Sequence, residues 1–484
     1  MSDLAYLTIA QAARLIQARK LSPVEFTRAL LARIAATDAT HHAYIAVTED
    51  LAIAQAKAAE AELMRGDWRG PLHGVPYAAK DIFDVAGMAT TCHSKLRIDH
   101  RASSDATAIV KLREAGAVLL GKLALHEFAT GGPTRELPWP AACNPWNVDL
   151  HPGGSSSGSG VAVAIGTAPG ALGTDTGGSV RNPATCCGVI GMKPTFGTVS
   201  RAGVFPLAFS LDHVGPLTRT VEDNAIMLQA IAAHDPADPT SSQRPTADFR
   251  RELNAGVKGL RIGLIAHFYD EDMIAVPEQS AAIATAAEVL RRLGADVTPI
   301  RLSSLQRYSE CGRTILMAEA FAVHERDLKQ RPQDYAAITR RKLLPGAFIP
   351  AADYVKAQQL RAALCAEFAA AMRHLDAAIT LSSLDMPCRI DDDDTIAKTY
   401  ERQARMPFNV TGTPAIAVPT GFTATGLPTA MQIVGRAFAE PMVYRVAQAY
   451  CEATRWCDHH PLAEPGAPKS FFEQADVEYQ GTEI

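Results

Sequence analysis

Apolar positions in the first seventy residues recur at the three- to four-residue spacing of helices that bury one face. An amphipathic run covers 9–17, and an alanine-rich helix is predicted over 51–64. Between them, Ser22 is placed to cap a helix that begins at Pro23, because a serine side chain accepts hydrogen bonds from free N–H groups and proline suits the first helical turn. The pattern predicts a helical N-terminal region, 1–69, packed against the rest of the chain.

Beyond this region the pattern changes to short apolar runs bounded by Gly and Pro, alternating with longer helical stretches. Strands are predicted at 118–121, 262–265 and 415–418, and helices at 280–293 and 354–372. Such alternation is typical of α/β proteins, whose strands are buried between two layers of helices. We therefore expect an α/β/α sandwich with a mixed, twisted central sheet covered by helices on both faces.

Composition limits the class of protein further. The 484 residues are 47% hydrophobic and 20% charged, which is typical of a soluble globular protein. The formal net charge is −5 and no dense Lys/Arg cluster occurs, so no nucleic-acid partner is expected. The N-terminus lacks a signal-peptide pattern, and the small apolar stretch at 161–168 is too short to span a membrane. With no repeat or low-complexity linker, we expect a single domain over 1–484.

Nine cysteines, an odd number, indicate reduced thiols and a cytoplasmic protein. Cys186 and Cys187 are adjacent, and buried small hydrophobes are favoured there over a redox pair. Four consecutive acidic residues at 391–394 are expected in a solvated loop. The sequence carries no metal or cofactor motif, and it leaves open whether the chain forms a homodimer.

The most informative stretch for function is 151–183, which holds two glycine–serine clusters separated by a small apolar segment. Glycine lets backbone N–H groups approach a bound atom, because no Cβ intervenes. A serine hydroxyl can attack a carbonyl carbon once a base accepts its proton. A nucleophile beside a turn rich in N–H donors is what acyl transfer requires. A loop with ordinary surface serines would not need two such clusters around a buried segment.

Two other glycine-rich motifs fit less well. Residues 154–158 match G-x-S-x-G, the nucleophile elbow of α/β-hydrolases, but that motif follows an apolar strand, and here His151 and Pro152 precede it. A phosphate-binding loop would require a lysine after the glycines, and 158–160 is not followed by one. Acyl transfer by another arrangement is therefore favoured.

The base that would activate the serine is not evident among the histidines, since none of the fourteen lies in a comparable glycine-rich context. Lys80 ends an apolar, strand-like run that starts at Gly74. Burial would lower its pKa toward the range in which a neutral amine accepts a proton. The alternative is a structural ion pair with Asp81 or Asp84, and the residue types alone favour this alternative.

Three spaced segments resemble the sequence boxes of the amidase signature family of serine hydrolases, and the resemblance extends over most of the chain. Residues 74–81 look like the family's lysine segment, 153–159 resemble its glycine–serine box, and 171–181 match its nucleophile box almost residue for residue. Further family-like stretches lie at 144–146, 191–195, 409–414 and 432–436. Ser157 departs from the pattern, because the family usually has glycine there; a small side chain is expected to fit.

The resemblance implies the α/β/α amidase signature fold and a Ser–cis-Ser–Lys triad. Ser179 would be the nucleophile, Ser155 would relay the proton after a cis peptide bond from Gly154, and Lys80 would be the final base. Lys80 lies 75 residues before Ser155, and Ser155 lies 24 residues before Ser179, as the family pattern expects. The intact triad argues against a catalytically silent binding protein on the same fold.

The resemblance also assigns residues around the triad. The oxyanion hole would be formed by backbone N–H groups, those of Thr176, Gly177, Gly178 and Ser179. Supporting positions are Gly154, Ser156, Asp175 and Arg181. The family's substrate-binding segment falls on Ala129, Thr130 and Gly131, and their small side chains leave room for an aryl or bulky acyl group.

The function expected from this resemblance is hydrolysis of a C–N bond in a small amide or carbamate, hydrophobic or aryl, by a stand-alone enzyme such as an aryl acylamidase or urethanase. No cofactor or metal is implied. The variable segment 300–400 would shape the pocket, with 317–323 and 348–354 as candidates. The alternative is the glutaminase subunit of a tRNA-dependent amidotransferase, which needs partner subunits. That subunit usually carries a tyrosine-rich segment where this chain has 340–346.

Overall fold

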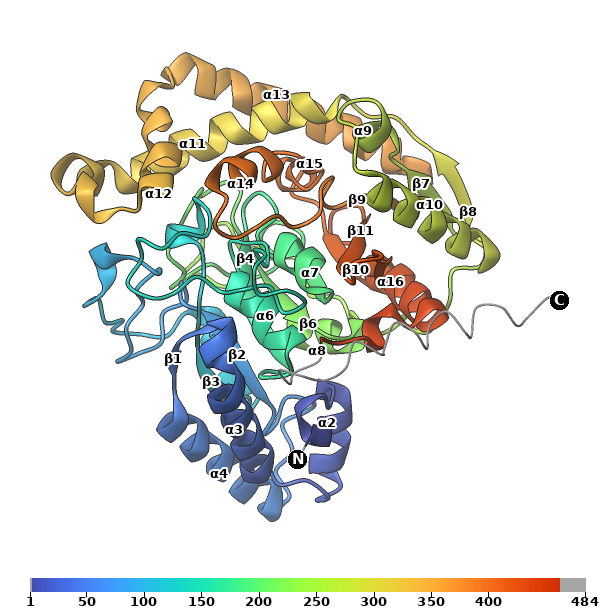
Figure 1. The fold of residues 1–484 in the computed structure, drawn as a ribbon. Coiled ribbons are helices and arrows are strands. Elements are labelled where there is room, and N and C mark those ends of the chain that lie inside the picture. The colour runs from blue at the N-terminus through green and yellow to red at the C-terminus, as the bar shows by residue number, and fades with distance from the viewer. Residues whose placement is uncertain (1, 462–484) are drawn as a thin grey trace.

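One eleven-stranded sheet runs through the protein in the computed structural model, which describes residues 2–461 (Figure 1). The strands lie in the order β1-β3-β2-β4-β6-β5-β10-β11-β9-β7-β8. Their bounds are β1 (Tyr44–Val47), β2 (Pro76–Lys80), β3 (Val118–Leu123), β4 (Gly170–Asp175), β5 (Ile190–Lys193), β6 (His213–Thr218), β7 (Arg261–Leu264), β8 (Asp296–Pro299), β9 (Ala377–Leu381), β10 (Ala415–Phe422) and β11 (Pro428–Val434).

Both kinds of strand pairing occur in this sheet. β2 pairs in parallel with β3 and β4, and β7 pairs in parallel with β8 and β9. The pairs that connect β4 through β6, β5, β10 and β11 to β9 are antiparallel. The predicted mixed central sheet is therefore confirmed.

The helices cover the sheet from both sides. α6 and α7 pack together against β4 and β10, whereas α8, α10 and α16 pack against β6, β10 and β11 from the other side. The helices of the described residues are α1 (Ser2–Ala5), α2 (Ile9–Gln17), α3 (Pro23–His41), α4 (Glu49–Arg65), α5 (Thr107–Glu114), α6 (Ser157–Ala164), α7 (Arg181–Cys187), α8 (Val221–Ile231), α9 (His267–Asp270), α10 (Pro277–Arg292), α11 (Leu305–Gln330), α12 (Ala337–Leu343), α13 (Ala351–Ala371), α14 (Asp393–Thr399), α15 (Met406–Val410) and α16 (Glu440–Thr454). The strands between the two layers are buried on both faces, as the α/β/α prediction requires.

The N-terminal helices agree with the sequence pattern. α2, α3 and α4 are present, and the Ser22 hydroxyl accepts hydrogen bonds from the N–H groups of Val24 and Glu25 at the start of α3. The prediction that the region is helical throughout is wrong at β1, where Tyr44 pairs with Leu123 of β3 in an antiparallel arrangement. Four residues are too few to show a period-two pattern, and their partner strand lies far along the chain.

The strands and helices predicted beyond this region are also confirmed, in β3, β7, β10, α10 and α13. The loop prediction for 391–394 is only partly correct, since the four side chains are exposed but Asp393 and Asp394 begin α14. The Asp392 side chain caps that helix by accepting the N–H of Thr395. A short exposed helix of this kind has too few residues for periodicity to reveal it.

The state of the cysteines and the character of the helices agree with the predictions from the sequence. All nine cysteines are free thiols, and Cys186 and Cys187 are buried at the end of α7, as expected for small hydrophobes. Within residues 2–461, no helix is both long enough and apolar enough to cross a lipid bilayer. The predicted single domain covers 1–484, of which residue 1 and residues 462–484 lie outside the described part of the chain.

Candidate active site

Lys80 is the last residue of β2 and lies beside β4, the strand that leads into the second glycine–serine cluster. Its side chain is fully buried, and Nζ lies 2.8 Å from Ser155 Oγ and 2.8 Å from Thr174 Oγ1. The ion-pair alternative for Lys80 is wrong. The Asp81 carboxylate instead accepts a hydrogen bond from Lys122 Nζ at 2.5 Å, and neither Asp81 nor Asp84 pairs with Lys80 among the described residues.

Ser155 lies in a loop that several hydrogen bonds hold against β4. The peptide bond from Gly154 to Ser155 is cis, and the Ser155 carbonyl accepts the N–H of His126 at 3.0 Å. The Ser156 hydroxyl donates to the Thr174 carbonyl at 3.2 Å, and the Ser156 N–H donates to the Ser179 carbonyl at 3.2 Å. This last bond joins the two glycine–serine clusters directly.

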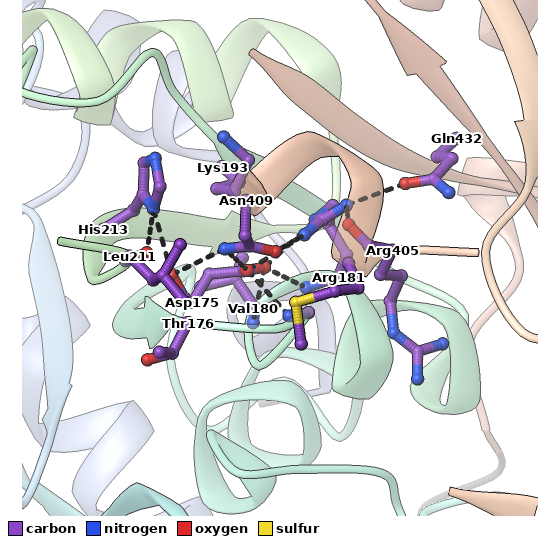
Figure 2. Close-up of polar contacts among 12 residues, drawn as sticks. Asp175, Thr176, Val180, Arg181, Lys193, Leu211, His213, Arg405, Asn409 and Gln432 are labelled. Atoms are coloured by element: carbon purple, nitrogen blue, oxygen red, sulfur yellow. Dashed lines mark hydrogen bonds and ion pairs between the residues drawn. The ribbon is translucent and has the colours of Figure 1, made fainter. Parts of the chain in front are cut away.

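The turn that carries Ser179 is held by a buried ion pair between Asp175 and Arg181 (Figure 2). The Asp175 carboxylate accepts the N–H of Gly178 at 2.8 Å and that of Val180 at 3.2 Å. Arg181 donates to the same carboxylate through Nε and Nη2, both at 3.0 Å. A turn tied at both its N–H groups and its flanking side chains keeps its backbone donors in fixed positions.

Residues from far along the chain complete this cluster. Arg181 also donates to the Asn409 side chain at 2.6 Å and to the Gln432 side chain at 2.8 Å (Figure 2). Gly178 has φ +124°, and a Cβ added there would overlap Arg405 Nε, so only glycine fits. The turn is therefore built jointly by β4, α7, α15 and β11.

A cavity of about 420 Å³ opens above this turn. Its wall contains both predicted catalytic serines and all the other predicted oxyanion and substrate-binding residues: Ser155, Ser179, Thr176, Gly177, Gly178, Ala129, Thr130 and Gly131. A second cavity of about 230 Å³ adjoins it and shares Ala129, Thr176 and Leu207. The structure thus brings residues from the glycine–serine box, the nucleophile box and the substrate-binding segment to one concave site.

A family model for Amidase matches residues 25–444, most of the chain. The chain belongs to the amidase signature family. Among curated relatives, it is 39% identical to the A subunit of the glutamyl-tRNA(Gln) amidotransferase of Roseiflexus castenholzii, over 95% of this chain and 98% of that protein.

Solved structures of amidases share the fold. The peptide amidase of Stenotrophomonas maltophilia superposes with a TM-score of 0.83 at 32% identity, over 93% of this chain and 97% of that one. A bacterial aryl acylamidase of the amidase signature family gives a TM-score of 0.86 at 27% identity, over 94% and 98% of the two chains. The chain is thus an enzyme of a family that acts on carbon–nitrogen bonds.

The electrostatics of this amidase site favour a neutral lysine. Burial lowers the pKa of Lys80 to about 7, and the nearby charges of Asp212 and Asp175 oppose that shift. Burial alone would raise the pKa of Asp175, but its ion pair and hydrogen bonds with Arg181 outweigh burial and hold that pKa well below its usual range. Asp175 therefore stays ionised, while a substantial fraction of Lys80 is uncharged at neutral pH.

Several side chains at the site could not be found from sequence patterns. Thr174 contacts Lys80, and His126, Tyr400 and Arg405 line the cavity from elements distant in sequence. Thr174 had one available signal, since it lies directly before Asp175 within the nucleophile box, 171–181. The others are adjacent only in the folded protein.

The segment 300–400 contributes to the cavity wall through α11, α12 and the residues around them. Within the candidate stretch 317–323, Met317 lines the cavity. The candidate stretch 348–354 does not line this cavity, and Phe348 is 83% exposed. Among residues 2–461, no cluster of three or more His, Cys, Asp or Glu side chains is arranged to hold a metal ion.

Proposed function

We propose that this enzyme hydrolyses the C–N bond of a small amide through an acyl-enzyme on Ser179. The observation that carries the proposal is the fully buried Lys80, whose Nζ lies 2.8 Å from the Oγ of Ser155, a residue that lines the same cavity as Ser179. A buried amine within hydrogen-bond reach of one serine can activate the second serine through it.

In the proposed reaction, Ser179 Oγ attacks the amide carbonyl carbon while Ser155 accepts its proton and passes its own proton to neutral Lys80. The negative charge that develops on the carbonyl oxygen is stabilised by backbone N–H groups of the turn. Lys80 then returns the proton through Ser155 to the leaving nitrogen, and the C–N bond breaks. Water attacks the acyl-enzyme with the same base, which releases the acid and regenerates Ser179.

Not all four predicted oxyanion donors are equally available. The Gly178 N–H already donates to Asp175 at 2.8 Å, whereas the N–H groups of Thr176, Gly177 and Ser179 have no hydrogen-bond partner among the described residues. We propose these three as the principal oxyanion donors, with Gly178 shaping the turn. Each such donor typically contributes about 3–4 kcal/mol to transition-state stabilisation.

The remaining predicted residues have positioning roles in this proposal. Asp175 and Arg181 hold the nucleophile turn, and Gly154 and Ser156 hold the loop of Ser155 against β4. Ala129, Thr130 and Gly131 would accommodate the part of the substrate next to the carbonyl. Gly131 has φ +81°, and a Cβ added there would lie 2.8 Å from Thr339 Oγ1, so a larger residue would push α12 away.

Two subclasses of amidase fit this chemistry. The curated relatives favour the A subunit of an amidotransferase, since they carry that name and match nearly the full chain. In that role the amide would be glutamine, and partner subunits would be required. The aryl acylamidase and the peptide amidase favour a stand-alone hydrolase, because their structures superpose closely on this one. An aryl amide or carbamate substrate rests on that structural likeness alone, and a cytoplasmic location stays a prediction.

The proposal is tested with purified protein and four substrates: glutamine, benzamide, p-nitroacetanilide and an N-(p-nitrophenyl) carbamate. Turnover of any of them should disappear in Ser179→Ala. Ser157→Ala is the matched control, because Ser157 is buried nearby but only donates a 3.4 Å hydrogen bond to Ala124, and it should retain turnover. Glutamine turnover that appears only with added amidotransferase partner subunits would assign the amidotransferase role. Turnover that survives in Ser179→Ala would contradict the proposal.

A further inference from the structure

The wall of the 420 Å³ cavity carries an excess of positive charge. Four cationic side chains line it, those of Arg313, Arg341, Lys342 and Arg405, against a single carboxylate, that of Glu401. Glu401 already forms an ion pair with Arg313 at 3.3 Å. No ion pair involves Arg341, Lys342 or Arg405 in the part of the chain that the structure describes. The cavity therefore offers three cations without an ion pair, and its one carboxylate is already paired.

Arg405 is the most constrained of these cations. It is only 4% exposed, and its Nη1 donates to the Ser382 carbonyl at 2.9 Å and to the Ser383 hydroxyl at 2.6 Å. Its Nε is buried without a hydrogen-bond partner and lies against Gly178, beside the Ser179 turn. Leaving a donor of a charged group buried and unpaired is unfavourable, and a ligand that accepts this hydrogen bond would remove the penalty.

Lys342 lies on the same wall. Its Nζ lies 5.6 Å from the centroid of the Tyr400 ring, and the Tyr400 hydroxyl lies 3.4 Å from His126 Nε2. Burial lowers the pKa of Lys342, and the nearby charge of Glu401 opposes that shift without forming an ion pair with the lysine. The wall formed by Lys342, Tyr400 and His126 thus extends from a cation without an ion pair to the loop of Ser155.

We propose that the cavity recognises an amide that carries an anionic group and no ammonium group, that is, a monoamide of a dicarboxylic acid, with its carboxylate bound by Arg405 and Lys342. This inference rests on the proposed amidase function of Ser179. The absence of a free carboxylate in the cavity leaves an ammonium group of the substrate without a partner. The anionic group, and not the amine, is then the feature that determines specificity.

Four amides of matched length test the proposal with the purified full-length protein. Glutamine carries a carboxylate and an ammonium group, glutaramate only the carboxylate, 4-aminobutanamide only the ammonium group, and butanamide neither. We expect kcat/KM for glutaramate to exceed that for butanamide by about 10-fold or more, because charged hydrogen bonds are lost without the carboxylate. The kcat/KM for glutamine should not exceed that for glutaramate, and the kcat/KM for 4-aminobutanamide should not exceed that for butanamide.

Two variants locate the effect. Lys342→Met should reduce the preference for glutaramate over butanamide by about 10-fold, mainly through a higher KM for glutaramate. Lys398→Met is the matched control, since Lys398 is an exposed cation of the adjacent α14 that does not line the cavity, and it should leave the preference unchanged. An equal loss of this preference in both variants would mean that only long-range charge attraction is at work, and it would overturn the assigned subsite.

Binding to Ser179→Ala separates this inference from the proposed function. If Ser179→Ala binds glutaramate more tightly than butanamide in an NMR titration while the wild-type protein hydrolyses neither, the anion subsite stands and the proposed amidase function fails. If butanamide binds as tightly as glutaramate, or if glutamine is preferred over glutaramate, the inference is overturned whether or not hydrolysis occurs.

Discussion

Replacing Lys80 by methionine should abolish amide turnover and at the same time change how the stability of the protein depends on pH. Burial lowers the pKa of Lys80 from 10.5 to about 7. At about 1.4 kcal/mol per pH unit, this difference disfavours the charged form in the folded protein by about 5 kcal/mol. The unfolded chain keeps the lysine charged up to about pH 10, so between about pH 7 and pH 10 the unfolded state binds more protons than the folded state.

The sign of the effect follows from this difference. Between about pH 7 and pH 10 the wild-type protein gains about 1.4 kcal/mol of stability from Lys80 per pH unit, and below pH 7 the contribution is constant at its least favourable value. Methionine does not titrate. The free energy of unfolding of Lys80→Met minus that of the wild type should therefore be most positive below pH 7 and fall with this slope toward pH 10.

The lost hydrogen bonds offset part of this gain at every pH. Ser155 Oγ and Thr174 Oγ1 each lose a contact with Lys80 at 2.8 Å, which costs about 1–3 kcal/mol per group if no new partner is found. The absolute difference near pH 7 is therefore small, between about 3 kcal/mol in favour of the variant and about 1 kcal/mol against it. The slope is unaffected, because neither hydroxyl titrates in this range.

Equilibrium urea unfolding at several values between pH 6 and pH 9.5 measures this slope. Lys122→Met is the matched control, because Lys122 is also buried but pairs with Asp81 at 2.5 Å. Its loss leaves a buried carboxylate unpaired and should destabilise the protein by about 3–5 kcal/mol with no comparable gain. Parallel pH profiles for Lys80→Met and the wild type would refute the reasoning, since they would mean that Lys80 is charged in the folded state.

Further predictions concern activity and the turn. The kcat/KM of the wild type should rise with pH with an inflection near pH 7, as Lys80 deprotonates, and a flat profile from pH 5.5 to 8.5 would contradict this. Asp212→Asn should move the inflection to lower pH, because the Asp212 charge opposes the lowering of the pKa of Lys80 by burial. Arg181→Met should destabilise the protein by about 3–5 kcal/mol in urea unfolding, because it leaves Asp175 buried without its ion pair. Arg301→Met, at an exposed pair with Glu271, should change the stability far less, and equal effects of the two variants would contradict this prediction. Gly158→Ala should lower the thermal midpoint strongly or prevent folding, since the new Cβ would overlap the Ala43 carbonyl oxygen, and a soluble, active variant would show that this backbone can shift.

Local sequence patterns predicted the parts of the fold that depend on neighbouring residues. Ser22 and Pro23 marked the start of α3, and the apolar runs marked β3, β7 and β10. β1 could not be predicted in this way, because its four residues become a strand only by pairing with β3. The order of the strands likewise depends on contacts between distant segments.

The residues of the site likewise fall into those that the sequence indicated and those that only the folded protein brings together. The sequence boxes indicated Lys80, Ser155 and Ser179, and in the structure the two serines line one cavity while Lys80 contacts Ser155. Residue types alone favoured an ion pair of Lys80 with Asp81 or Asp84, because the sequence does not reveal that Asp81 pairs with Lys122 of β3. Arg405 could not be assigned to the cavity without the fold, since the turn it contacts lies more than two hundred residues earlier.

The most direct test of the account is to trap the acyl group on the enzyme. The protein is mixed with p-nitrophenyl acetate, quenched in acid within the burst of p-nitrophenol release, digested, and analysed by peptide mass spectrometry. The account predicts an acetyl group on Ser179, which is absent in Ser179→Ala and accumulates more slowly in Lys80→Met. An acetyl group on Ser155 in the wild type, or a burst that persists unchanged in Ser179→Ala, would contradict it.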